Sequence, residues 1–148
     1  MTDFTDSDVI VIGGGAAGMF SACLLAKAGK RVIIIEPNRK LGRKLRITGK
    51  GRCNLTNNSS NGNIIKNIVR NPKFMYSALS GFSSADVMDW FETRGVKLKT
   101  ERGARVFPVS DNANDIADAM EKELRRYRAV VVKDKALRIL AENGRVTG

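Results

Sequence analysis

The chain has 148 residues, of which 43% are hydrophobic, and this composition suits one globular domain with a sizeable core. It contains no histidine and two cysteines, Cys23 and Cys53, which excludes Ser-His-Asp and Cys-His catalysis, a disulfide framework and a four-ligand zinc site; we expect no metal centre. Two cysteines without a framework favour a reducing, cytoplasmic compartment, and the formal net charge of +11 makes an anionic cofactor or partner worth testing.

The first predicted elements form a strand, helix, strand unit. Two unbroken β-branched runs, Val9–Ile12 and Val32–Ile35, predict parallel strands that are covered on both faces. The intervening segment Ala16–Ala28 has the length and composition of a helix, and Gly29 is suited to end it. This order predicts an α/β fold with a Rossmann-like parallel sheet.

Three glycines after the first strand, Gly13, Gly15 and Gly18, have the G-x-G-x-x-G spacing of dinucleotide-binding turns. Their missing side chains permit a tight turn, approach of the main chain to a diphosphate, and close packing of helix on sheet. Glu36 follows eighteen residues after Gly18, where a carboxylate can accept hydrogen bonds from the adenosine ribose and repel a 2′-phosphate, which favours FAD or NAD over NADP. The expected cofactor contacts of this unit are Gly13, Gly14, Gly15, Ala16, Ala17, Gly18, Glu36 and Pro37.

Two other interpretations of the glycine segment compete. Gly14 and Gly18 have the G-x-x-x-G spacing of a membrane helix, but four glycines within one segment make a poor helix. The glycines can also form a purely structural turn, although this leaves the position of Glu36 unexplained.

A basic cluster follows the second strand. Seven lysines and arginines lie between Arg39 and Arg52 without an intervening acid. The cluster can be a solvated loop, a nucleic-acid-binding patch or a set of counter-charges for a cofactor diphosphate. Its place after the second strand, beside the crevice where doubly wound sheets bind ligands, favours the last of these.

Two further segments make a family resemblance specific. The run LGRKLRITGKGRCNLTN at residues 41–57 and the segment GARVFPVSDNANDIADAM at residues 103–120, together with the glycine unit, resemble the BaiN-type NAD(P)/FAD-dependent oxidoreductases. This flavoprotein family includes aminoacetone oxidases and bile-acid dehydro-reductases. The resemblance covers nearly the whole chain.

The resemblance implies an extended FAD, with the glycine turn at its diphosphate and Glu36 at its adenosine ribose. It also makes Arg43 and Lys44 plausible phosphate or ribityl partners, and Arg46 equally so. The residues implied nearer the flavin are Gly49, Gly51, Arg52, Cys53 and Asn54, because the two glycines allow close approach of the main chain.

The two cysteines have different expected roles. Cys53 is a weak catalytic candidate, because Lys50 and Arg52 would lower its thiolate pKa if they faced it, but a simple packing role is as consistent with the sequence. Cys23 lies in an apolar helix and is expected in the core.

The remaining elements are predicted from capping and alternation. Residues 57–62 read as a loop, Pro72 starts one helix, and Ser83 and Asp86 form a capping box for another. Strands are expected at residues 96–100 and 105–108, a helix at 115–127, a third parallel strand at 129–132 and a hairpin turn at 142–144. Trp90, Phe91 and Phe107 are expected in the core.

This pattern predicts two structural parts. Residues 1–57 and 103–148 would form the FAD-binding domain, and residues 58–102 an insertion packed against it. The hairpin at the end would begin a β-meander, so that we expect a truncated, N-terminal portion of a longer enzyme.

The expected function is hydride transfer through FAD to or from a small organic molecule, with NAD(P)H or oxygen as redox partner. Two alternatives remain: a nucleic-acid-associated flavoprotein of the tRNA-modifying type, which the basic cluster suggests, and a noncatalytic nucleotide-binding module. We expect a small-molecule substrate rather than nucleic acid, and no membrane association.

Overall fold

The computed structural model describes residues 7–148, and these fold into two compact units. The first unit ends at Leu45 and resumes with Met120–Gly148, and the second is Arg46–Ala119. These boundaries differ from the predicted domains, because residues 56–57 and 105–108 pair in one sheet with residues 98–101. The second unit is therefore larger than the predicted insertion.

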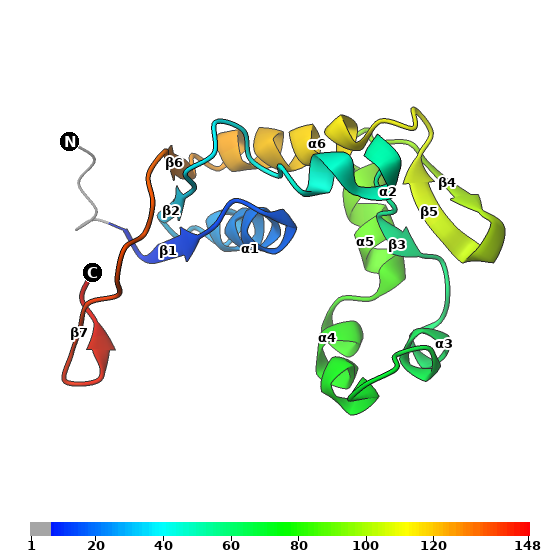
Figure 1. Ribbon diagram of the computed structural model, residues 1–148, viewed down its shortest axis with the longest axis horizontal. Coiled ribbons are helices and arrows are strands. Elements are labelled where there is room, and N and C mark those ends of the chain that lie inside the picture. The colour runs from blue at the N-terminus through cyan, green and yellow to red at the C-terminus, as the bar shows by residue number, and fades with distance from the viewer. Residues whose placement is uncertain (1–6) are drawn as a thin grey trace. The chain divides into compact units, whose positions relative to one another are not determined.

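The first unit contains the parallel sheet that the sequence predicts. Strands β1 (Val9–Ile12), β2 (Val32–Ile35) and β6 (Val130–Val132) lie in the order β1-β2-β6 (Figure 1). Helix α1 (Ala16–Lys27) connects β1 to β2, which pair in register from Val9 with Val32 onward. The expected third parallel strand is confirmed by the pairing of β6 with β2.

The core of this unit lies between the sheet and the helices. Met19, Ile34 and Leu124 are fully or almost fully buried, and Cys23 is 3% exposed, which confirms its expected place in the core. The cover on both faces that was predicted for the strands at 9–12 and 32–35 is found for β2, but within residues 7–148 it is wrong for β1, where Ile10 and Ile12 are exposed.

Glycine ends α1 as predicted. Ala28 caps the helix, and Gly29 has a φ of 83°, in the left-handed region where a side chain would be strained.

The long amphipathic helix is α6 (Ala113–Arg126), whose buried residues include Ile116 and Leu124 at the predicted spacing.

The second unit is built on an antiparallel sheet. Strands β3 (Thr56–Asn57), β4 (Leu98–Glu101) and β5 (Arg105–Pro108) lie in the order β3-β5-β4, and a short 3-10 turn, η3 (Arg102–Ala104), joins β4 to β5. The β4–β5 hairpin was predicted, whereas β3 was not. Phe107 is 4% exposed, so its expected core position is confirmed.

Along the chain, short helices precede β3 and lie between β3 and β4. They are η1 (Leu45–Ile47), α2 (Thr48–Gly51), α3 (Asn61–Lys66), η2 (Pro72–Met75), α4 (Tyr76–Gly81) and α5 (Ser84–Glu92). The capping box of α5 is confirmed, because the Ser83 and Asp86 side chains each accept from the other residue's backbone N–H. Trp90 and Phe91 of this helix are buried, as predicted.

A small hairpin follows the parallel sheet. Strands β7 (Ala141–Glu142) and β8 (Arg145–Val146), red in Figure 1, flank Asn143 and Gly144, which both have positive φ. This confirms the predicted turn, although the strands are shorter than the flanking runs of the sequence. Among residues 7–148, no helix combines the length and the apolar character needed to cross a bilayer.

Candidate nucleotide-binding site

We call the residues Gly13–Gly18 the glycine turn. At two of these positions, neighbouring protein atoms lie so close that an added Cβ would clash with them. A Cβ at Gly18 would lie 2.0 Å from the Gly13 carbonyl oxygen, and one at Gly14 would lie 2.3 Å from Leu41 Cδ2. Gly13 has a φ of 96° and so uses the left-handed region directly. The turn is therefore closely packed, against its own backbone at Gly18 and against the segment after β2 at Gly14.

Gly15 differs from its neighbours because its missing side chain leaves open space. A Cβ there would meet nothing within 4 Å, and its φ of −78° would accept any residue. Gly15 is the N-cap of α1 with no side-chain cap, and Ala16 and Ala17 are exposed. The first amides of a helix lack intrahelical partners and attract anions, so the turn fits a phosphate group.

Glu36 lies beside the turn and holds it. The carboxylate is 8% exposed; Oε2 accepts from the Gly14 N–H at 2.8 Å, and Oε1 accepts from the Asn38 N–H at 2.8 Å. These bonds from Asn38 and Gly14 lower the pKa of Glu36 below its usual value, so the carboxylate is charged at neutral pH. An ionised carboxylate retains accepting capacity for ribose hydroxyls, which is the predicted role.

Two residues that the sequence reasoning missed complete this arrangement. The Asn38 side chain donates to Glu36 Oε1 and accepts from Arg43 Nη1 at 3.3 Å. The Gly42 N–H donates to the Gly14 carbonyl at 2.7 Å. Gly42 lies within the run at residues 41–57, but its spacing does not indicate a contact with Gly14, and Asn38 belongs to no motif; the placement of the loop after β2 reveals both contacts.

The other predicted contacts of the first unit lie on the surface. Pro37, Arg43 and Lys44 are exposed and follow Glu36 along the loop. Arg46, in the second unit, instead pairs with Asp118 at 2.8 Å and donates to Asn114 Oδ1 at 2.7 Å. Within the first unit the structure thus brings the glycine turn and Glu36 together, with Arg43 linked to them through Asn38.

The remaining predicted contacts form a separate cluster in the second unit, the segment Thr48–Asn54, which we call the left-handed loop. Its residues Gly49, Lys50, Gly51 and Cys53 have φ values of 56°, 58°, 84° and 58°. A Cβ at Gly49 would lie 3.1 Å from the Asn54 amide nitrogen. The unusual dihedrals expected for the two glycines are confirmed and extend to two residues with side chains.

Cys53 is buried in this loop with 1% exposure, whereas Asn54 is exposed. Burial raises the pKa of the Cys53 thiol, and a hydrogen bond with the Thr48 side chain only partly offsets this. The expected lowering of the thiolate pKa by Lys50 and Arg52 is therefore not found. A catalytic role for Cys53 stays a prediction without support from this environment.

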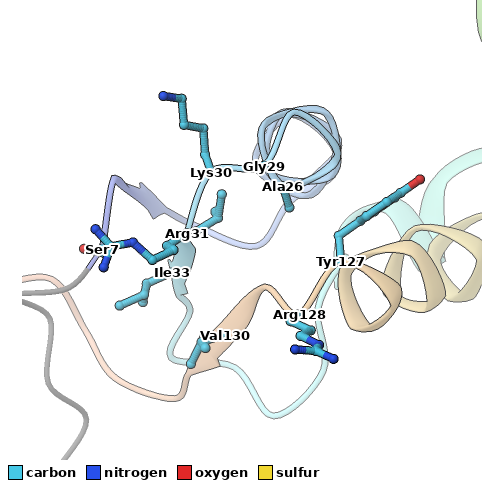
Figure 2. Close-up of a pocket in the computed structure, with 10 residues that line it drawn as sticks. Ser7, Ala26, Gly29, Lys30, Arg31, Ile33, Tyr127, Arg128 and Val130 are labelled. Carbon is cyan, nitrogen blue, oxygen red and sulfur yellow. The ribbon is translucent and has the colours of Figure 1, made fainter.

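A pocket of about 390 Å³ lies elsewhere in the first unit (Figure 2). It is lined by Gly29, Arg31, Tyr127 and Val130, among others, where β2 and β6 begin. Figure 2 shows Lys30 extending outward from the turn before β2. Ligands of parallel α/β sheets bind at the opposite, carboxyl ends of the strands, so we assign no role to this pocket. Among the described residues no group of acidic or cysteine side chains is arranged to hold a metal ion.

Comparisons with known proteins agree with this geometry. The model of the HI0933-like protein Rossmann domain matches residues 7–147. The chain is 32% identical to the 3-dehydro-bile acid delta(4,6)-reductase of Clostridium scindens, over 89% of the chain and 33% of that protein. It is 35% identical to the ribosomal RNA dihydrouridine synthase of Escherichia coli K12, over 95% of the chain and 37% of that protein. The chain thus spans about a third of the length of these curated relatives.

A solved structure supports the fold. THI4 of Thermovibrio ammonificans superposes with a TM-score of 0.59 at 16% identity, and the alignment covers 95% of this chain and 44% of that one. At this identity the likeness shows the Rossmann-like fold alone.

Proposed function

Because the chain belongs to the HI0933-like Rossmann-domain family, we propose that it is the FAD-binding part of a flavin-dependent oxidoreductase. The observation that carries this proposal is the open glycine turn. Gly14 and Gly18 lack side chains to fit the protein itself, whereas the space beside Gly15 has no protein occupant within 4 Å of a Cβ. An uncapped helix start favours an anionic group, and the diphosphate of FAD is such a group.

Different residues would bind different parts of the cofactor. The amides of Gly15, Ala16 and Ala17 would bind the diphosphate, and Glu36 would accept from the adenosine ribose. Arg43 and Lys44 would supply positive charge from the exposed loop. When bound, FAD supplies hydride transfer between a reductant and an organic substrate.

We propose a small molecule with an activated carbon–carbon double bond as the substrate, and NAD(P)H as the electron source that reduces it. Oxygen would be the electron acceptor if the flavin instead takes hydride from the substrate. Support for the double bond comes from the names of two relatives, a delta(4,6)-reductase and a dihydrouridine synthase, since both describe addition of hydrogen. A cytoplasmic location fits the two free cysteines.

A second candidate substrate is RNA. Ten lysines and arginines and no acid lie between Glu36 and Asp86. Such a charge distribution binds phosphate backbones, and the relative from E. coli is named for ribosomal RNA. If RNA is the substrate, a ribosomal RNA hairpin will bind with strong salt dependence in a fluorescence anisotropy titration; absence of binding at low salt would eliminate this candidate.

The cofactor assignment is tested by calorimetric titration with ADP, FAD and 2′,5′-ADP. ADP and FAD should bind at least tenfold more tightly than 2′,5′-ADP, because Glu36 repels the added phosphate. The Glu36→Gln variant should show a smaller difference between its affinity for ADP and its affinity for 2′,5′-ADP. ADP binding without FAD binding would instead favour the noncatalytic nucleotide module, and equal affinity for ADP and 2′,5′-ADP would contradict the role of Glu36.

A further inference from the structure

The left-handed loop is strained where it has side chains. Lys50 and Cys53 both adopt φ values of 58°, a left-handed conformation that is unfavourable for a residue with a Cβ. Such conformations persist only where surrounding contacts determine them. The contacts that hold this loop in its conformation therefore point to the function of that conformation.

Arg52 contacts both the β4–β5 hairpin, at Glu101, and the turn after β5, at Asp111. Its Nε donates to Asp111 Oδ1 at 2.8 Å, and its Nη2 pairs with Glu101 Oε1. The guanidinium also lies 4.3 Å from the centre of the Phe107 ring. Lys99 adds a second cation, 2.7 Å from Asp111 Oδ2.

This network balances its own charge. Two cations, Arg52 and Lys99, contact two carboxylates, Glu101 and Asp111. The arginine lowers the pKa of the Glu101 carboxyl, and Lys99 and then Arg52 lower that of Asp111, so both acids are ionised at neutral pH. Two of the three guanidinium nitrogens, Nε and Nη2, are therefore already engaged by carboxylates.

We propose that Arg52 is a positioning residue that clamps the left-handed loop onto the β4–β5 hairpin, so that the loop's main chain, rather than the guanidinium, meets the ligand. The clamp itself rests on contacts within the second unit. That the loop meets a ligand, and that this ligand is FAD, rests on the proposed function. Arg52 was predicted to contact the cofactor; the clamp gives it a different task in the same segment.

The two cysteines provide a direct readout. Cys53 follows Arg52 and is 1% exposed, so its alkylation requires the loop to open. Cys23 is 3% exposed in α1 of the first unit, and its thiol donates to the Met120 carbonyl at 3.4 Å. Cys23 therefore serves as an internal control for general unfolding.

Iodoacetamide labelling, followed by mass spectrometry of each cysteine peptide, tests the clamp. Arg52→Gln and the double variant Glu101→Gln/Asp111→Asn should each speed Cys53 labelling on the order of tenfold, without changing Cys23 labelling. Arg52→Lys should recover part of the protection. Arg105→Gln is the matched control, because Arg105 lies farther from the same ring, at 5.9 Å, and its Nε donates to the Arg102 carbonyl.

Two results would overturn the clamp: unchanged Cys53 labelling in Arg52→Gln, or equal acceleration of both cysteines. FAD titration then separates positioning from direct binding. A clamp predicts that Glu101→Gln/Asp111→Asn weakens FAD binding as Arg52→Gln does, whereas a direct phosphate ligand freed from its carboxylates would bind FAD more tightly. If the wild-type chain binds no FAD, the proposed function fails while the labelling result still decides the clamp.

Discussion

The glycine turn of the first unit and the left-handed loop of the second both depend on glycine, but their surroundings differ. In the glycine turn, Gly14 and Gly18 are pressed against protein atoms while the space beside Gly15 is open. In the left-handed loop, the shape extends to Lys50 and Cys53, and Arg52 ties it to two carboxylates. The first region is a rigid frame around one open position, whereas the second is a strained segment held by side-chain contacts.

A substitution at Gly18 is the most direct way to disrupt the packing of the glycine turn. Gly18→Ala would place a Cβ 2.0 Å from a backbone oxygen, and we expect the free energy of unfolding to fall by about 3 kcal/mol. Urea denaturation measures this loss. Gly62→Ala is the control, because a Cβ there meets nothing within 4 Å; equal stability of the two variants would show that the turn is not closely packed.

The hydrogen bonds of Glu36 give a smaller effect that depends on pH. The folded-state pKa of Glu36 lies below its usual value of 4.5, so its stabilisation is present above that value and is lost as the pH falls through the folded-state pKa. Glu36→Gln should lower the melting temperature at pH 7 by several degrees and flatten its dependence on pH in the acid range. The exposed Glu142→Gln serves as control; parallel pH curves for wild type and Glu36→Gln would refute the contribution.

Strain in the left-handed loop predicts a small effect of opposite sign. Lys50→Gly removes the cost of a left-handed residue and should leave stability unchanged or raise it by up to about 1 kcal/mol. Lys97→Gly is the matched control, since Lys97 is exposed and does not have a positive φ, and it should destabilise by about 0.5–1 kcal/mol. Thermal unfolding compares the two, and a loss at Lys50 as large as at Lys97 would argue against strain.

The sequence predicted the first region far better than the second. The strands at 9–12 and 32–35, the spacing of Gly13, Gly15 and Gly18, and the helix end at Gly29 are local features, because each depends on residues close in the chain. The burial of the strands was less predictable, because a continuous apolar run does not indicate which face of a strand is covered by other elements. Ile12, for example, is 58% exposed.

The second region depends on contacts between distant residues. Arg52 is 49 residues from Glu101 and 59 from Asp111, and β3 pairs with β5 across a similar separation. No short motif encodes such partners. The sequence therefore identified Arg52 as functionally interesting from its neighbours but could not show that its charge is already neutralised.

The most direct test of the account is the affinity of the chain for FAD with and without a methyl group at Gly15. Gly15→Ala fits the fold, because its φ is −78° and nothing lies within 4 Å of the added Cβ. Alanine is less favoured than glycine at an N-cap, so we expect a small fall in melting temperature without loss of the fold. If a diphosphate occupies this space, calorimetry will show FAD binding at least tenfold weaker in Gly15→Ala than in the wild type or the Gly62→Ala control. Equal FAD affinity in all three proteins would contradict the placement of the cofactor at the glycine turn.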